Sequence, residues 1–148
     1  MMDSIDGDTS LLRRYPDAGV LAATQDERRT DVTVAGTVSS APTYFFGRRT
    51  HAWHERFTIV TEHGLRLEIV DNVDLAPRVP VRPGDVVAVS GQFIPGRHGG
   101  LIHDTHHCPG PGWHRGGWVE WHGRRFEALQ TGREERAVLD GSRRTIFG

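Results

Sequence analysis

The chain has 148 residues, a length typical of one domain, and its 18 basic and 19 acidic residues give a formal net charge of −1. This balance excludes the broad cationic footprint of a strong nonspecific DNA binder, and no apolar run is long enough to span a membrane. A single cysteine, Cys108, excludes an internal disulfide framework. We expect a cytoplasmic protein, because that cysteine fits a reducing compartment and the first ten residues do not resemble a signal peptide.

The predicted elements begin with a leader and a helix. Residues 1–16 are polar and acidic, so we expect a flexible leader. Apolar residues within 17–29 have helical spacing, with Asp17 in the N-cap position, which predicts a short helix. The apolar period then changes from helical to two, which is typical of half-buried strands. The predicted strands cover 31–38, 53–61, 65–69, 86–93, a segment from 101 and, less regularly, 118–121.

Segments rich in proline and glycine separate these strands. Residues 41–52 are expected to form a loop, and three prolines between 72 and 83 forbid a central strand there. Five strands with an interruption after the third predict an all-β fold: a small, OB-like, partly open barrel of five or six strands with a short N-terminal helix. An SH3-like barrel is the competing topology. The predicted division is a leader over 1–16, one OB-like domain over 17–127 and a charged tail over 128–148.

The segment from His103 to Cys108 holds five possible metal ligands in six residues. Imidazole and thiolate groups suit zinc or another late transition metal. On an extended strand His103 and His107 would lie about 13 Å apart, so a shared ion needs a bend in the chain or ligands from elsewhere, such as His54 or His114. No recognised zinc spacing is present, and hydrogen-bonded histidines on a barrel rim, or acid–base chemistry without metal, would explain the same crowding.

A second cluster follows residue 51. By strand parity His54 and Arg56 share one face, while Trp53, Glu55 and Phe57 share the other. We expect Trp53 and Phe57 to point to the core, which leaves His54 and Arg56 outward, where they suit an anionic ligand. Glu55 either turns inward, where it needs a partner, or lies in water. A plain solvated strand face is an equal alternative.

Two further segments contribute polar and aromatic groups. Asn72 lies where an Asx side chain caps a turn, and Arg78 is expected to pair with an acid. Trp118 follows a glycine-rich stretch that also contains Arg115, a combination that stacks bases in single-strand binders. The same residues would also serve as packing over one end of a barrel.

At these residues the sequence resembles a family of small bacterial domains of unassigned activity. The shared motifs are a histidine–arginine–phenylalanine strand, an Asn-Val-Asp-Leu-Ala-Pro-Arg-Val-Pro connector and a Gly-Gly-Leu-Ile-His-Asp-Thr-His-His run; they stand at residues 54–57, 72–80 and 99–107. The resemblance covers residues 18–127. It implies that the histidines at 54, 103, 106, 107 and 114 form one constellation. Members often begin with an export signal, which we do not expect in this chain, and its segment from Phe45 to Arg49 looks longer.

The sequence thus favours, narrowly, a zinc-dependent hydrolase acting on phosphodiesters, in which a metal-bound water attacks and arginine stabilises phosphate charge. The alternative is a non-catalytic OB-like module that binds single-stranded nucleic acid or a small anionic ligand. A histidine site that only closes the barrel is a third hypothesis. The sequence does not indicate an oligomeric state. The predicted site residues are Glu55 and Asp104 as general bases; His54, His103, His106, His107 and His114 as metal ligands; and Arg56, Asn72, Arg78 and Trp118 as ligand contacts.

Overall fold

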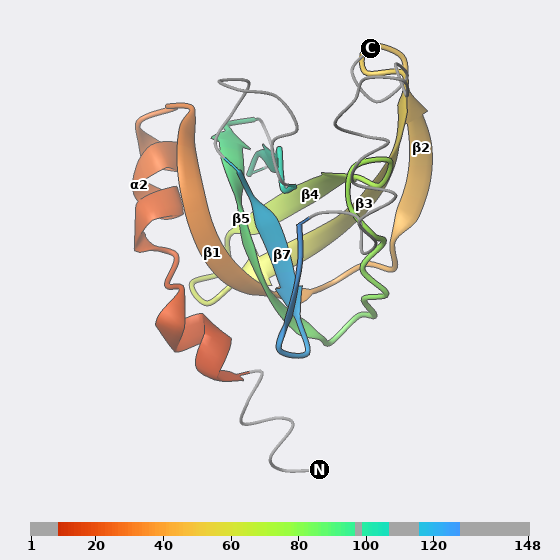
Figure 1. The fold of residues 1–148 in the computed structure, drawn as a ribbon. Helices are drawn as coiled ribbons and strands as arrows, with labels where there is room; N and C mark the ends of the chain where they lie inside the picture. The colour runs from red at the N-terminus through yellow and green to blue at the C-terminus, as the bar shows by residue number, and fades with distance from the viewer. Residues whose placement is uncertain (1–8, 97–98, 107–115, 128–148) are drawn as a thin grey trace.

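A computed structural model describes residues 9–96, 99–106 and 116–127. Residues 9–14 are helical, and one further helix and eight strands follow (Figure 1). Their bounds are α2 (Ala18–Gln25), β1 (Thr30–Val38), β2 (Thr43–Gly47), β3 (Ala52–Thr61), β4 (Arg66–Asn72), β5 (Val86–Ile94), β6 (Leu101–His103), β7 (Trp118–Trp121) and β8 (Arg124–Phe126). Neither helix in this part of the chain is long and apolar enough to cross a membrane.

Five of the strands close into a barrel. Their order is β1-β3-β4-β6-β5, and β1 also pairs with β5 over residues 30–37, which completes the circle. All pairs are antiparallel except β4 with β6. This is the Greek-key order of the OB fold, so the prediction of an OB-like barrel with a short N-terminal helix is confirmed, and the SH3-like alternative is not.

The barrel core follows from the period-two pattern of the strands. Phe57, Ile59, Leu67, Ile69 and Phe93 are each at most 1% exposed. Val20 and Ala23 of α2 join this core. Figure 1 shows α2 alongside β1, with β2 on the opposite side of the barrel. α2 therefore buries one apolar face against the barrel, as expected for a short surface helix.

Asp17 precedes α2 but does not cap it: its side chain makes no cap hydrogen bond. The carboxylate, 1% exposed, instead accepts the backbone N–H of His63 at 2.9 Å and lies 2.7 Å from the His63 Nδ1. Burial acts to raise the pKa of Asp17, but hydrogen bonds from His63 and Thr61 outweigh it and hold that pKa below its usual value. The same hydrogen bond raises the pKa of His63. Asp17 therefore fastens the β3–β4 turn to the start of α2.

We expect Asp17→Asn to lower Tm by about 2–4 °C at pH 5.5 and by less at pH 8. The charged pair requires His63 protonated, so its stabilisation is full below the unfolded histidine pKa and is lost as pH rises through the raised folded pKa. Asparagine keeps the acceptor for the backbone N–H but removes the charge. Thermal unfolding at the two pH values measures the difference. An equal loss at both would contradict a contribution from the charged pair with His63.

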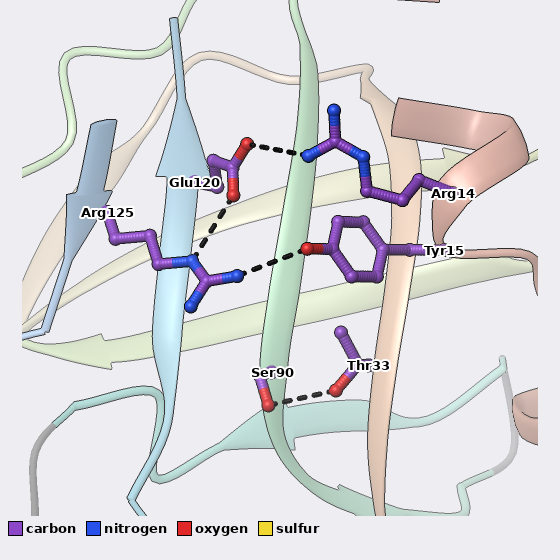
Figure 2. A network of polar contacts seen from close by, with 6 residues as sticks. All are labelled: Arg14, Tyr15, Thr33, Ser90, Glu120 and Arg125. Carbon is purple, nitrogen blue, oxygen red and sulfur yellow. Dashed lines mark hydrogen bonds and ion pairs between the residues drawn. The ribbon is translucent and has the colours of Figure 1, made fainter. Parts of the chain in front are cut away.

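The segment N-terminal to α2 also packs on the barrel. Leu11 is buried with Ala35 and Ala88, and the Tyr15 ring meets Trp118 at 5.6 Å. Figure 2 shows the polar contacts here: the Arg125 guanidinium donates to the Tyr15 hydroxyl at 3.1 Å and to Glu120 at 3.3 Å. Residues 9–15, which the sequence assigns to a flexible leader, thus lie against β1, β5 and β7. The division into leader, domain and tail stays a prediction, since 1–8 and 128–148 lie outside the described residues.

Two strands differ from the expectation. β2 forms within the segment expected to be a loop, and β8 follows a turn at His122 and Gly123. Both are hairpin partners of neighbouring strands: β2 pairs with β3, and β8 with β7. Their short runs of aromatic and arginine residues carry no period-two apolar pattern, because neither covers the core with a full face.

Candidate functional site

The site lies on the outer surface of β3, β4 and β6. Interior residues alternate with outward ones, so the neighbours of the buried Phe57, Ile69 and Ile102 face away from the core. Phe45 of β2 pairs with His54 and shares its side. We call this surface the β3–β4 face; its side chains are Phe45, His54, Arg56, Thr58, Arg66, Glu68, Asn72, Leu101 and His103.

Three flat groups are assembled at one end of the β3–β4 face. The Phe45 ring stacks on the His54 imidazole with centroids 5.1 Å apart and planes 15° apart. The Arg56 guanidinium lies 5.1 Å from the Phe45 centroid and 3.5 Å from a Glu68 carboxylate oxygen. Arg56 and Glu68 are 47% and 41% exposed. Arginine and aromatic planes in this arrangement offer both a stacking surface and a cation.

His54 is held as a neutral ring. It is 8% exposed, and burial lowers the pKa of its imidazole; the Ala52 backbone and the charge of Asp74 oppose this shift, and the charge of His103 adds to it. Its Nδ1 is buried and has no hydrogen-bond partner among the described residues. The end of β2 covers that atom, since a Cβ on Gly47 would lie 3.1 Å from Nδ1. His54 therefore supplies a flat aromatic surface rather than a charge at neutral pH.

The other end of the β3–β4 face is hollowed. A pocket of about 350 Å³ lies between the outward side chains of β3, β4 and β6 and the connector that follows β5. Thr58, Arg66 and Glu68 supply its polar walls, and Ile94, Pro95 and Leu101 its apolar ones. The face thus combines a polar pocket with a cation and stacked rings.

His103 lies at the border of the β3–β4 face. Its Nε2 is 2.8 Å from the Gln92 Oε1 and 3.6 Å from Asp104, which has a positive φ of 57°. Thr105 and His106 are buried behind it. In the described part of the chain no three His, Cys, Asp or Glu side chains are grouped to hold a metal ion. His107 and His114 lie outside the described residues, so the zinc site stays a prediction.

The expected general base Glu55 lies inside the barrel. It is fully buried, with one carboxylate oxygen accepting the Val79 N–H at 2.9 Å and the other the Tyr44 hydroxyl at 3.4 Å. Burial raises the pKa of Glu55, although these two donors oppose the shift. Of the two alternatives drawn from the sequence, the inward one with partners is the observed one. His54 and Arg56 are therefore on the opposite side of β3 from Glu55.

Asp71 is the buried neighbour of Glu55. The two residues are directly paired across β3 and β4, and Asp71 is also fully buried. Its Oδ1 accepts the Thr105 hydroxyl at 2.9 Å, whereas its Oδ2 has no partner among the described residues. Burial raises the pKa of Asp71 well above its usual value, and the neighbouring Glu55 adds to the shift. This pair of interior carboxyls was not predicted from the sequence, because Asp71 reads there as a turn residue.

The other residues predicted as ligand contacts do not all lie on the β3–β4 face. Asn72 is on the β3–β4 face but uses its Oδ1 to accept the Asp74 N–H at 3.0 Å, as expected of a turn cap. Arg78 lies 4.7 Å from the Tyr44 ring centroid, and its charge acts on the buried Glu55, whose pKa it lowers. Trp118 lies under the Arg125 guanidinium, 3.9 Å from it, and against Tyr15, away from β3 and β4. The structure thus brings together His54, Arg56, Asn72 and His103 and leaves Glu55, Arg78 and Trp118 elsewhere.

The position of Trp53 contradicts the prediction from the sequence. It was expected to point to the core with Phe57 but is 50% exposed. β3 is ten residues long and pairs with β4 only from His54 onward, so its first residues extend past the barrel end, where the inward-facing side meets solvent. Phe45 was not predicted as a site residue, because its segment was expected to form a loop. Four β-prone residues at 43–46, three of them aromatic, were the available signal.

The closed strand order β1-β3-β4-β6-β5 defines an OB-fold domain. The chain belongs to the family described as "Protein of unknown function (DUF3465)", whose model matches residues 9–127. The expected membership of an uncharacterised domain family is thereby confirmed. No curated protein matches the sequence.

Among solved structures, the chain is similar to one in the crystal structure of the S. pombe Stn1–Ten1 complex. The identity is 16%, the TM-score is 0.39, and the match covers 74% of this chain and 65% of that chain, just under two thirds of its length. The OB assignment therefore rests on the strand order.

Proposed function

We propose that this barrel binds single-stranded nucleic acid on the β3–β4 face, without chemistry. The observation that carries the proposal is the stack of Arg56, Phe45 and His54 on the outer side of β3. OB folds bind oligonucleotides and oligosaccharides over these two strands and the loops beside them. Aromatic and guanidinium planes stack on bases of any sequence, and a cation beside them contacts the phosphate.

The charge distribution supports a short anionic strand. The chain is nearly neutral overall, but residues 43–56 contain Arg48, Arg49 and Arg56 and one acid, the buried Glu55. The β2–β3 hairpin thus carries a local excess of positive charge, although Arg56 shares its charge with Glu68 at 3.5 Å. A few phosphates are enough to neutralise it, and a duplex footprint is not expected.

The hydrolase hypothesis is less well supported. A general base must reach the reacting group, and Glu55 is buried on the other side of β3 with both oxygens engaged. Asp104 remains beside His103, at the border of the face. Because the zinc site stays a prediction, the binding assay includes a chelator: we expect binding to survive EDTA.

The test is fluorescence anisotropy with labelled oligodeoxythymidine of about 5 nucleotides, the lower end of site sizes for one OB fold. Arg56→Ala is expected to weaken binding at least fivefold and to reduce the slope of log K against log salt by about 0.7. Arg124→Ala is the matched control, since Arg124 also lies over a phenylalanine ring, 4.5 Å from Phe126, but on β8. Absence of binding by the wild-type protein, or equal effects of the two variants, would contradict the proposal.

A further inference from the structure

Three large aromatic side chains are exposed on the other side of the β2–β3 hairpin. Tyr44, Phe46 and Trp53 are 41%, 47% and 50% exposed, and they are the exposed large hydrophobic residues of the described chain. Register pairs Phe46 with Trp53, and their rings meet edge to face at 5.7 Å. We call Tyr44, Phe46 and Trp53 the aromatic patch. A cluster of exposed rings on a small domain marks an interaction surface.

The neighbours of the aromatic patch are cationic. The Arg78 guanidinium lies 4.7 Å from the Tyr44 centroid, and the His51 ring meets Phe46 at 6.3 Å. Arg48 and Arg49 occupy the exposed turn between the two strands. The nearby acids are the buried Glu55 and Asp74, whose carboxylate accepts the Trp53 N–H at 3.1 Å, so the three arginines outnumber the acids around the patch. The patch therefore complements an anionic partner with flat apolar groups, which is the chemistry of a nucleic acid strand.

The aromatic patch and the β3–β4 face are the two sides of one thin hairpin. Successive residues of β2 alternate, so Phe45 is on one side and Phe46 on the other. In the described part of the chain β2 pairs only with β3, which leaves its second edge with unpaired backbone N–H groups. A nucleic acid strand that crosses the β2 edge would pass those N–H groups. It would reach the rings on both sides of the hairpin.

We propose that a single strand bound on the β3–β4 face continues around the β2 edge, and that its next bases stack on Phe46 and Trp53. This inference rests on the proposed function and adds a second subsite to it. The site size of the domain then exceeds what the β3–β4 face alone accommodates.

The experiment compares oligodeoxythymidines of about 5 and about 15 nucleotides, the two ends of the range for one OB fold. The double variant Phe46→Ala/Trp53→Ala is expected to weaken binding of the longer probe at least tenfold and leave the shorter one within twofold. The variant Phe46→Tyr/Trp53→Phe keeps both rings and is expected to retain affinity. Since both residues are exposed, the alanine variant should keep the wild-type Tm, which thermal unfolding checks.

The outcomes separate the two proposals. If the wild-type protein binds neither probe, the proposed function fails. If it binds both and the alanine variant binds them as well as wild type, only the second subsite is refuted. Equal weakening of both probes would also refute it, because the patch would then be part of the primary site. Capture of an acidic peptide by the patch, with unchanged binding of the longer probe, would assign the patch to a protein partner instead.

Discussion

Asp71→Asn is expected to stabilise the protein at pH 8 by about 1–3 kcal/mol. The wild-type carboxyl is fully buried, its Oδ2 lacks a partner among the described residues, and Glu55 lies directly opposite. A charged Asp71 is therefore costly there. Asparagine has the same shape and never ionises.

The sign of the pH dependence follows from the raised pKa of Asp71. The folded state holds the Asp71 proton more tightly than the unfolded chain, so wild-type stability is full below the unfolded pKa of about 3.9 and is lost as pH rises through the folded one. The advantage of Asp71→Asn should hence disappear near pH 4. Urea unfolding at the two pH values measures it.

Asp31→Asn is the control for this experiment. Asp31 is an exposed carboxyl on β1, and its replacement should change the free energy of unfolding by less than about 0.5 kcal/mol at either pH. If Asp71→Asn instead destabilises the protein at pH 8, another group must stabilise the ionised Asp71 carboxylate. The account of the interior carboxyl pair would then be wrong.

Gly91→Ala is expected to destabilise the barrel by about 1–3 kcal/mol, through overpacking. A Cβ at this position would lie 2.4 Å from the His103 carbonyl oxygen and 2.9 Å from the Thr105 methyl. Gly91 marks the point on β5 where pairing passes from β6, at Gln92, to β7, at Ser90. The backbone of residues 103–105 can approach only because no side chain stands there.

This substitution should also alter the site, since His103 and Thr105 would have to move. Displacement of Thr105 removes the donor to Asp71, a hydrogen bond that favours the ionised carboxyl and lowers its pKa. The destabilisation should therefore be larger at high pH, where Asp71 ionises, than at low pH. Gly19→Ala is the matched control: a Cβ there has no heavy atom within 4 Å, and alanine favours the helix. Equal stability of Gly91→Ala and wild type in urea would contradict the close approach.

Much of the fold could be predicted because the period-two pattern is strong in β1, β3, β4 and β5, which form the barrel wall. The pattern fails where a strand leaves the core. Trp53 has the parity of Phe57, yet it lies past the barrel end, and sequence parity contains no information about where the barrel stops. Aromatic residues in such a position resemble core residues in sequence.

Of the candidate site, the sequence predicted the residues that lie together on one strand but not their partners from other strands. His54 and Arg56 were placed outward correctly, since one strand determines their side. Their partner Phe45 comes from a hairpin strand between Pro42 and the Arg48–Arg49 pair, a composition typical of a loop. The Asp71 and Glu55 pairing depends on the β3–β4 register, which no local pattern reveals.

Photocrosslinking tests the central claim most directly. A labelled single strand carrying bromodeoxyuridine, irradiated on the full chain and mapped by mass spectrometry, should attach to Phe45, His54 or other side chains of the β3–β4 face. Attachment should fall in Arg56→Ala and persist in Arg124→Ala. Crosslinks confined to β7 and β8, or none under conditions where the strand is bound, would contradict a nucleic acid site on this face.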